Sequence, residues 1–218
     1  MIAATVPRGA DFETVNKNVT VIPNFIIPAI QQSKPAKRNP VILTIANLIP
    51  IKGIDLLLQA AELVLHRHPE WRWKIIGDGE NKTLVNDFII SEKLQDRLIL
   101  QLPVNHDLSS EYLEVSILAL TSRSESFGMV LLEAMNFGLP CVSFDCETGP
   151  RHIIQDNVTG LLVRKEDSVS LAEAISLLIS NEEKRNGMGK NSLDNVRDFY
   201  PKKVYALWKQ LFQSEKFV

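Results

Sequence analysis

Short apolar runs alternate with longer segments of helical spacing from Val41 onward. The apolar runs are predominantly Val, Ile, Leu and aromatic residues, as is typical of strands buried on both faces. They lie at 41–46, 71–76, 97–100, 117–120, 141–144 and 160–163. Segments with helical spacing lie at 54–65, 83–91, 108–114, 128–138, 168–180, 182–199 and 201–213. Strands that alternate with helices predict βαβ units and a mostly parallel sheet.

The pattern divides the chain into three parts. Residues 1–40 hold a short strand near Val19 and then a polar, proline-bearing stretch, which predicts a linker with a solvated basic run at Lys34–Arg38. Residues 41–200 predict an α/β domain with a doubly wound, Rossmann-like sheet. Residues 201–218 predict a C-terminal helix.

Five loops follow directly after predicted strands. They lie at 47–53, 77–80, 101–107, 121–128 and 145–151. Because ligands of doubly wound sheets bind outside the carboxyl ends of the strands, these loops predict one pocket.

The most informative loop lies within Ser122–Met135, where a strand, a tight loop and a helix follow each other. Gly128 opens the helix, so backbone N–H groups and the positive end of its dipole face the sheet edge, which suits a phosphate. Glu125 and Glu133 flank this position. Carboxylates repel phosphate, so we expect them to accept hydrogen bonds from hydroxyl groups. A nucleotide sugar carries both phosphates and hydroxyls.

The other loops add candidates of differing specificity. Lys52 precedes Gly53 at a helix start, where its charge can reach a diphosphate. A lone lysine there is more typical of a solvated surface, and it is the neighbouring strand-end loops that favour the diphosphate contact. The turn ending at Gly79 lacks the third glycine of a dinucleotide-binding fingerprint. We expect it to let a ligand approach the backbone, and direct contact with the ligand stays open. Arg151 fits either an anion contact or a surface turn.

Composition narrows the class of protein. A net charge of −2 gives no reason to expect nucleic acid. Two cysteines without a metal-ligand pattern indicate free thiols in a reducing compartment. No apolar run approaches the about 20 residues of a membrane span, so we expect a cytoplasmic chain. Four dispersed histidines and the absence of an Asp-x-Asp pair predict that no metal is required.

Several of these residues carry a family resemblance that covers about residues 20–212. Glu125-Ser126-Phe127-Gly128, then Leu131 to Met135, Gly138-Leu139-Pro140 and Asp156 to Val163 resemble the signature of family 4 (group 1) retaining glycosyltransferases with the two-domain GT-B fold. The loop Phe144 to Pro150 is most similar to bacterial members that build lipopolysaccharide, capsule or other surface glycans.

The resemblance implies transfer of a hexose, with retention, from a nucleotide-diphosphate sugar such as a UDP-sugar to a glycan or lipid-linked acceptor. Glu125 would be the catalytic-site carboxylate that contacts the donor sugar, and Glu133 would hold the ribose. Lys52 and the backbone N–H groups of Phe127, Gly128 and Met129 would hold the diphosphate. The remaining implied donor-site residues are Asn47, Gly53, Gly79, Arg123 and Ser126, and residues 102–104 would border the base.

Two departures from the family pattern shape the expectations. Asn47 stands where the family usually has an arginine, so Arg123 or Arg151 would have to supply that charge. Family members also have an N-terminal domain that supplies the acceptor site and often touches the inner membrane. We therefore expect residues 1–40 to be the end of that domain and its linker, and this chain alone to be inactive. A non-catalytic sugar-nucleotide module and a GT-B epimerase remain the alternatives.

Overall fold

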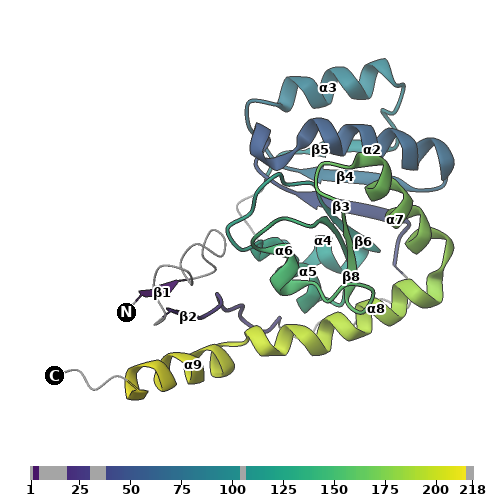
Figure 1. The fold of residues 1–218 in the computed structure, drawn as a ribbon. Coiled ribbons are helices and arrows are strands. Elements are labelled where there is room, and N and C mark those ends of the chain that lie inside the picture. The colour runs from purple at the N-terminus through teal and green to yellow at the C-terminus, as the bar shows by residue number, and fades with distance from the viewer. Residues whose placement is uncertain (1, 5–18, 30–37, 104–106, 215–218) are drawn as a thin grey trace.

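The structure is a computed structural model that describes residues 2–4, 19–29, 38–103 and 107–214 (Figure 1). Its centre is a six-stranded sheet in the order β5-β4-β3-β6-β7-β8, with every strand pair parallel. The strands are β3 (Val41–Ile45), β4 (Arg72–Ile76), β5 (Leu98–Gln101), β6 (Ile117–Leu120), β7 (Cys141–Phe144) and β8 (Gly160–Val163). The chain winds outward from β3 in both directions, so the predicted doubly wound α/β fold is confirmed.

Helices connect the strands, and three more α-helices follow the last strand in the described residues. They are α2 (Ile54–Arg67), α3 (Lys82–Ser91), α4 (Ser109–Glu114), α5 (Met129–Asn136), α6 (Pro150–Ile153), α7 (Ser168–Ser180), α8 (Glu182–Asn195) and α9 (Pro201–Ser214). Short 3-10 helices lie at η1 (Pro50–Lys52) and η2 (Val196–Phe199). The helix predicted over 182–199 is thus divided, because α8 gives way to a tighter turn at Val196.

Alternate strand residues face two separate apolar cores. Ile42 and Trp73 pack against α2 and α7 on one face of the sheet, and Leu43 and Leu118 pack against α5 on the other. Trp73 is wholly buried, and its indole N–H donates to Thr44 Oγ1 at 3.0 Å. Helices cover both faces, which explains why the strands are apolar on both sides.

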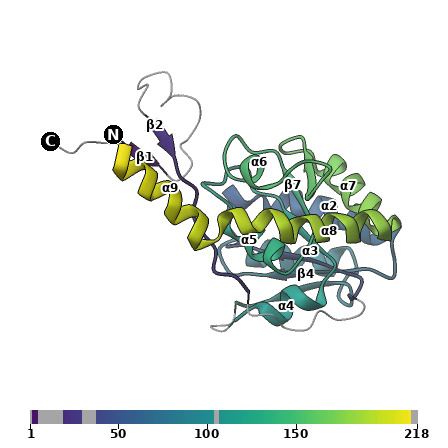
Figure 2. The ribbon, with the colours of Figure 1, turned by 90° about the horizontal axis from the view of Figure 1, so that it is seen from below.

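A smaller unit lies beside the domain. β1 (Ile2–Ala4) and β2 (Val19–Val21) form a two-stranded parallel sheet. Figure 2 shows α9 extending away from the main sheet and past β2. Ile22, Val204 and Leu211 form a buried cluster there, so α9 packs on the segment that precedes the domain.

Arg38 corrects the prediction of a solvated basic run. Its guanidinium donates to the carbonyl groups of Tyr112 (2.6 Å), Val115 (2.8 Å) and Phe137 (2.5 Å), and more weakly to Leu113 (3.2 Å). Burial lowers the pKa of Arg38 to about 10. The carbonyl groups at helix C-termini lack partners within the helix and carry negative partial charge, so the ends of α4 and α5 attract the cation. The rest of the run lies outside the described residues.

Candidate functional site

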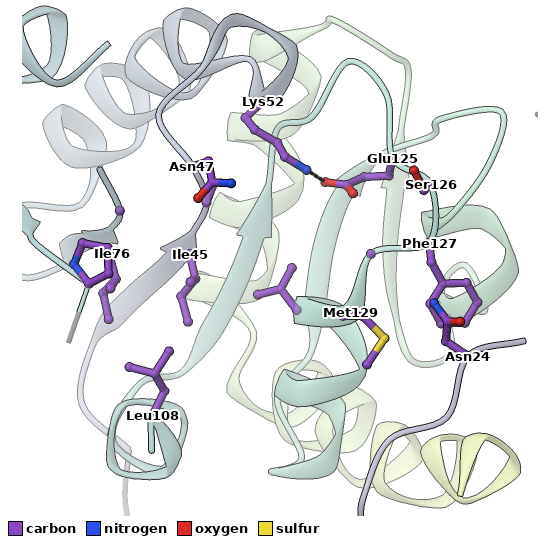
Figure 3. A pocket seen from close by; sticks show the side chains of 15 residues that line it. Asn24, Ile45, Asn47, Lys52, Ile76, Leu108, Glu125, Ser126, Phe127 and Met129 are labelled. Carbon is purple, nitrogen blue, oxygen red and sulfur yellow. Dashed lines mark hydrogen bonds and ion pairs between the residues drawn. The ribbon is translucent and has the colours of Figure 1, made fainter. Parts of the chain in front are cut away.

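A pocket of about 480 Å³ opens at the carboxyl ends of the central strands (Figure 3). Lys52 and Glu125 lie on one side of it, and Leu108 and Met129 lie on the other. The complete lining is Asn24, Ile45, Ala46, Asn47, Lys52, Ile76, Gly77, Pro103, Leu108, Glu125, Ser126, Phe127, Gly128, Met129 and Val130. The pocket therefore forms where the strand-end loops predicted it, although loop 145–151 does not line it.

Lys52 and Glu125 form an ion pair across the pocket edge. Lys52 Nζ lies 2.5 Å from Glu125 Oε1, and Ser122 Oγ donates to the same oxygen at 2.6 Å. The side chains are 23% and 10% exposed. Among the described residues that line the pocket, Lys52 is the only cation and Glu125 the only carboxylate. A ligand phosphate that approached Lys52 would therefore compete with Glu125.

Hydrogen bonds to backbone carbonyl groups join the loop that carries Lys52 to the loop that carries Glu125. Thr121 Oγ1 donates to the Lys52 carbonyl at 3.0 Å, and the Arg123 N–H donates to the Ile51 carbonyl at 2.8 Å. Gly53 has a φ of +62°, and a Cβ there would lie 2.1 Å from the Thr121 carbonyl oxygen. Only glycine permits this approach, so Gly53 brings Lys52 to Glu125 through backbone geometry.

Loop 145–151 supports the Glu125 loop from behind. Thr148 Oγ1 donates to the Glu125 carbonyl, and Cys146 Sγ contacts the Ser122 carbonyl at 3.0 Å. Gly149 has a φ of +79°, and a Cβ there would lie 2.7 Å from the Phe127 carbonyl oxygen. The bend at Gly149 thus shapes the site by holding the neighbouring Glu125 loop.

The N-terminus of α5 offers backbone donors to the pocket. Gly128 adopts a φ of +93° as the N-cap and gives no side-chain cap. The N–H groups of Met129 and Val130 find no acceptor within the part of the chain that the structure describes. Since both residues line the pocket, these donors and the helix dipole suit an anion there.

Glu133 lies outside the pocket lining, one helical turn along α5 from Met129. Tyr112 Oη donates to Glu133 Oε2 at 2.6 Å. Tyr112 is 3% exposed as a residue, and its ring stacks on Phe137 with centroids 5.4 Å apart. Burial first, and then the charge of Glu133, raise the pKa of Tyr112 well above its ordinary value of 10.0. The hydroxyl therefore stays protonated as a hydrogen-bond donor.

The two arginines considered as replacements at Asn47 are engaged elsewhere. Arg123 makes a two-pronged contact with Asp55, at 2.8 and 2.6 Å, which lowers the pKa of that carboxyl. Arg151 pairs with Asp145 at 3.0 Å. Neither arginine lines the pocket, whereas Asn47 does. Asp55 lies in α2, far from Arg123 in the chain, whereas Asp145 lies in the same loop as Arg151.

Gly53 and Gly79 also stand outside the pocket lining. The Gly53 N–H donates to the Pro50 carbonyl at 3.0 Å, and Gly79 packs on the backbone of Leu48. Their predicted donor contacts, like that of Arg123, stay predictions. Of the residues expected to border the base, Pro103 lines the pocket and Val104 lies outside the described residues.

Sequence reasoning missed two polar features of the site. Asn24 lines the pocket from the segment before the domain, and Tyr112 partners Glu133 from α4. Neither belongs to a motif, and only the three-dimensional arrangement brings them to the site. Within the described residues, no group of three or more His, Cys, Asp or Glu side chains could hold a metal ion. No helix in the same ranges is long and apolar enough to cross a membrane.

The fold and the pocket together define a Rossmann-like α/β domain of the GT-B glycosyltransferase class, with its pocket at the carboxyl edge of a parallel sheet. The chain belongs to the family "Glycosyl transferases group 1", whose model matches residues 27–194. An uncharacterized glycosyltransferase of Haemophilus influenzae is 30% identical over 199 residues, which are 91% of this chain and 55% of that protein.

Two further similarities point in the same direction. The amylovoran biosynthesis glycosyltransferase AmsD of Erwinia amylovora is 30% identical, over 81% of this chain and 49% of its own length. The crystal structure of the pneumococcal O-GlcNAc transferase GtfA, in complex with UDP and GlcNAc, superposes with a TM-score of 0.79 at 27% identity. The superposition covers 90% of this chain and 40% of the GtfA chain. The family resemblance is thus confirmed, and the chain spans about half the length of these curated relatives.

Proposed function

We propose that this chain binds the donor of a retaining glycosyltransferase, a UDP-sugar, and that the complete enzyme transfers its hexose to a glycan or lipid-linked acceptor. The observation that carries this proposal is the convergence of Lys52, Glu125 and the free N–H groups of α5 on one pocket. UDP and GlcNAc in the pneumococcal relative support the choice of donor.

Each group has a separate task in the proposal. The diphosphate lies at the N-terminus of α5, where the N–H groups of Met129 and Val130 and the charge of Lys52 stabilise the negative charge that develops on the leaving group. Glu125 accepts hydrogen bonds from the donor sugar. Glu133 accepts hydrogen bonds from the ribose, and the base lies near Pro103 and Ile76.

The proposed reaction breaks the bond between the anomeric carbon and the diphosphate oxygen and forms a bond to an acceptor hydroxyl. The bonding electrons pass to UDP, and the proton of the acceptor hydroxyl leaves with it. Because the chain spans about half the length of its curated relatives, we propose that it supplies the donor side and that the acceptor side belongs to another domain. We propose further that the complete enzyme works in the cytoplasm, against the inner membrane.

Titration calorimetry of the chain with UDP, with and without EDTA, tests this proposal. We expect one site with micromolar to millimolar affinity and the same affinity in EDTA, because Lys52 and helix N–H groups hold the diphosphate without a metal. Loss of binding in EDTA would contradict the metal-free site. A second assay incubates the chain alone with UDP-GlcNAc, and epimerisation of its sugar would favour the epimerase instead.

A further inference from the structure

Tyr112 and Glu133 form a pair just behind the pocket wall. Leu108 lines the pocket, and the Tyr112 N–H donates to the Leu108 carbonyl at 3.2 Å, so Tyr112 lies one helical turn from the lining. Glu133 lies one helical turn from Met129, which also lines the pocket. Residues four apart on a helix share a face. The pair therefore lies behind the pocket wall, where α4 meets α5.

The position of the Tyr112 ring is fixed from two sides. It is buried and stacks on Phe137 at an interplanar angle of 11°. Arg38 donates to the backbone carbonyl groups of both Tyr112 and Phe137, at 2.6 and 2.5 Å. A ring held in this way leaves its hydroxyl little freedom, so the hydrogen bond to Glu133 is pre-organised.

The hydrogen bond leaves part of the Glu133 carboxylate available. Tyr112 donates to Oε2 at 2.6 Å, and no other donor reaches Glu133 from the described residues. A carboxylate accepts about four hydrogen bonds through its two oxygens, so Glu133 keeps the capacity to accept further hydrogen bonds. A raised pKa keeps the Tyr112 hydroxyl protonated, so it donates without a proton change when ligand binds.

We infer that Tyr112 is a positioning residue that orients the Glu133 carboxylate toward the ribose hydroxyls of the nucleotide donor. The inference rests on the proposed function, since it requires Glu133 to contact the ribose. Without the Tyr112 hydroxyl, Glu133 would have to be ordered when ligand binds, and this costs affinity. Tyr112 itself makes no contact with the reacting atoms.

Calorimetry on four forms of the full chain tests the inference: wild type, Tyr112→Phe, Glu133→Ala and the double variant. The probes are UDP, GDP and ADP, and then the 2′,3′-dideoxy form of whichever binds wild type most tightly. Tyr112→Phe keeps the stacked ring and removes only the hydroxyl. We expect it to weaken binding of the ribonucleotide about fivefold, which is the typical cost of ordering one side chain on binding.

Two comparisons separate positioning from packing. We expect Tyr112→Phe to leave the affinity for the dideoxy nucleotide unchanged, and to have no further effect in the Glu133→Ala background. Tyr200→Phe is the matched control, because the Tyr200 hydroxyl donates to Asn136 at the other end of α5 at 2.9 Å. We expect it to change stability without changing nucleotide affinity.

The outcomes are distinguishable. If Glu133→Ala weakens binding and Tyr112→Phe does not, the inference is overturned while the proposed ribose contact stands. Equal weakening of both nucleotides by Tyr112→Phe, or a further loss in the double variant, would mean that Tyr112 acts through packing and not through Glu133. An unchanged affinity in Glu133→Ala, or no binding of any of the three nucleotides, would overturn the proposed ribose contact and this inference together.

Discussion

The carboxylates of Glu125 and Glu133 differ in the partner that each one has. Glu125 lies in a loop and faces a cation, with Lys52 Nζ at 2.5 Å. Glu133 lies on α5 and faces a neutral hydroxyl, with Tyr112 Oη at 2.6 Å. The charge of Glu125 is therefore balanced by Lys52, whereas the charge of Glu133 has no ion-pair partner within the described residues.

This difference separates two kinds of ligand recognition. At the Lys52–Glu125 end, an incoming diphosphate must share or take the cation that Glu125 holds. At the Tyr112–Glu133 end, a ligand hydroxyl would meet a carboxylate that already accepts one hydrogen bond, from Tyr112. We infer that one end responds to ligand charge and the other to ligand hydroxyl groups, and the predictions below disturb each end in turn.

Replacement of Arg38 by Met should have the largest effect on stability. It removes the donor for carbonyl groups at the ends of α4 and α5, and we expect a loss of about 2–4 kcal/mol in the free energy of unfolding. Urea denaturation measures this loss, and Arg197→Met is the control, because Arg197 lies in an exposed pair with Asp194. A loss no larger than that of the control would contradict the stabilising role of Arg38 at the ends of α4 and α5.

Replacement of Lys52 by Met tests the opposite end of the pocket. It removes the only cation among the described lining residues and leaves Glu125 unpaired beside the phosphates. We expect about a 10-fold to 100-fold loss of UDP affinity, or about 1.4–2.8 kcal/mol. Calorimetry measures the affinity, with the exposed Lys203→Met as the charge-matched control. A similar loss in both variants would indicate general charge attraction.

Replacement of Asp55 tests whether its partner Arg123 lies outside both the Lys52–Glu125 end and the Tyr112–Glu133 end. Its hydrogen bond with Arg123 lowers the pKa of Asp55 below the ordinary value of 3.8. The stabilisation is therefore present above pH 3.8 and is lost as the pH falls through the lower folded-state pKa. Because Asp55 is 47% exposed, we expect Asp55→Asn to cost less than about 1 kcal/mol at pH 7.

Urea denaturation of Asp55→Asn and wild type at several pH values measures this effect. The difference between the two proteins should shrink toward zero as the pH falls below 3.8. UDP affinity at pH 7 should stay unchanged. A weaker affinity for UDP in Asp55→Asn would instead connect Arg123 to the donor.

Local sequence patterns predicted most of the fold. The strand runs are apolar because helices cover both faces of the sheet, and this pattern is readable without a structure. The same pattern placed the pocket, because strand-end loops of a parallel sheet share one edge. Glu125, Lys52 and the start of α5 were predicted together for this reason.

The pairings between distant residues were not readable. Arg38 lies in a basic run, and nothing near it in the chain indicates the helix ends that bury it. Arg123 and Asp55 are 68 positions apart, and Tyr112 and Glu133 are 21 apart. Such contacts depend on how the helices pack over the sheet, and the periodicity of one segment does not specify that.

The contrast between the two carboxylates is tested most directly by the affinity of UDP for Glu125→Gln and Glu133→Gln, measured side by side by calorimetry. UDP carries no sugar, so Glu125→Gln should release Lys52 to the diphosphate and strengthen binding by about threefold. Glu133→Gln should weaken it by a similar factor, because an amide accepts fewer hydrogen bonds from the ribose. Changes of opposite sign are the predicted result. Weakening in both variants, or no change in either, would contradict the account.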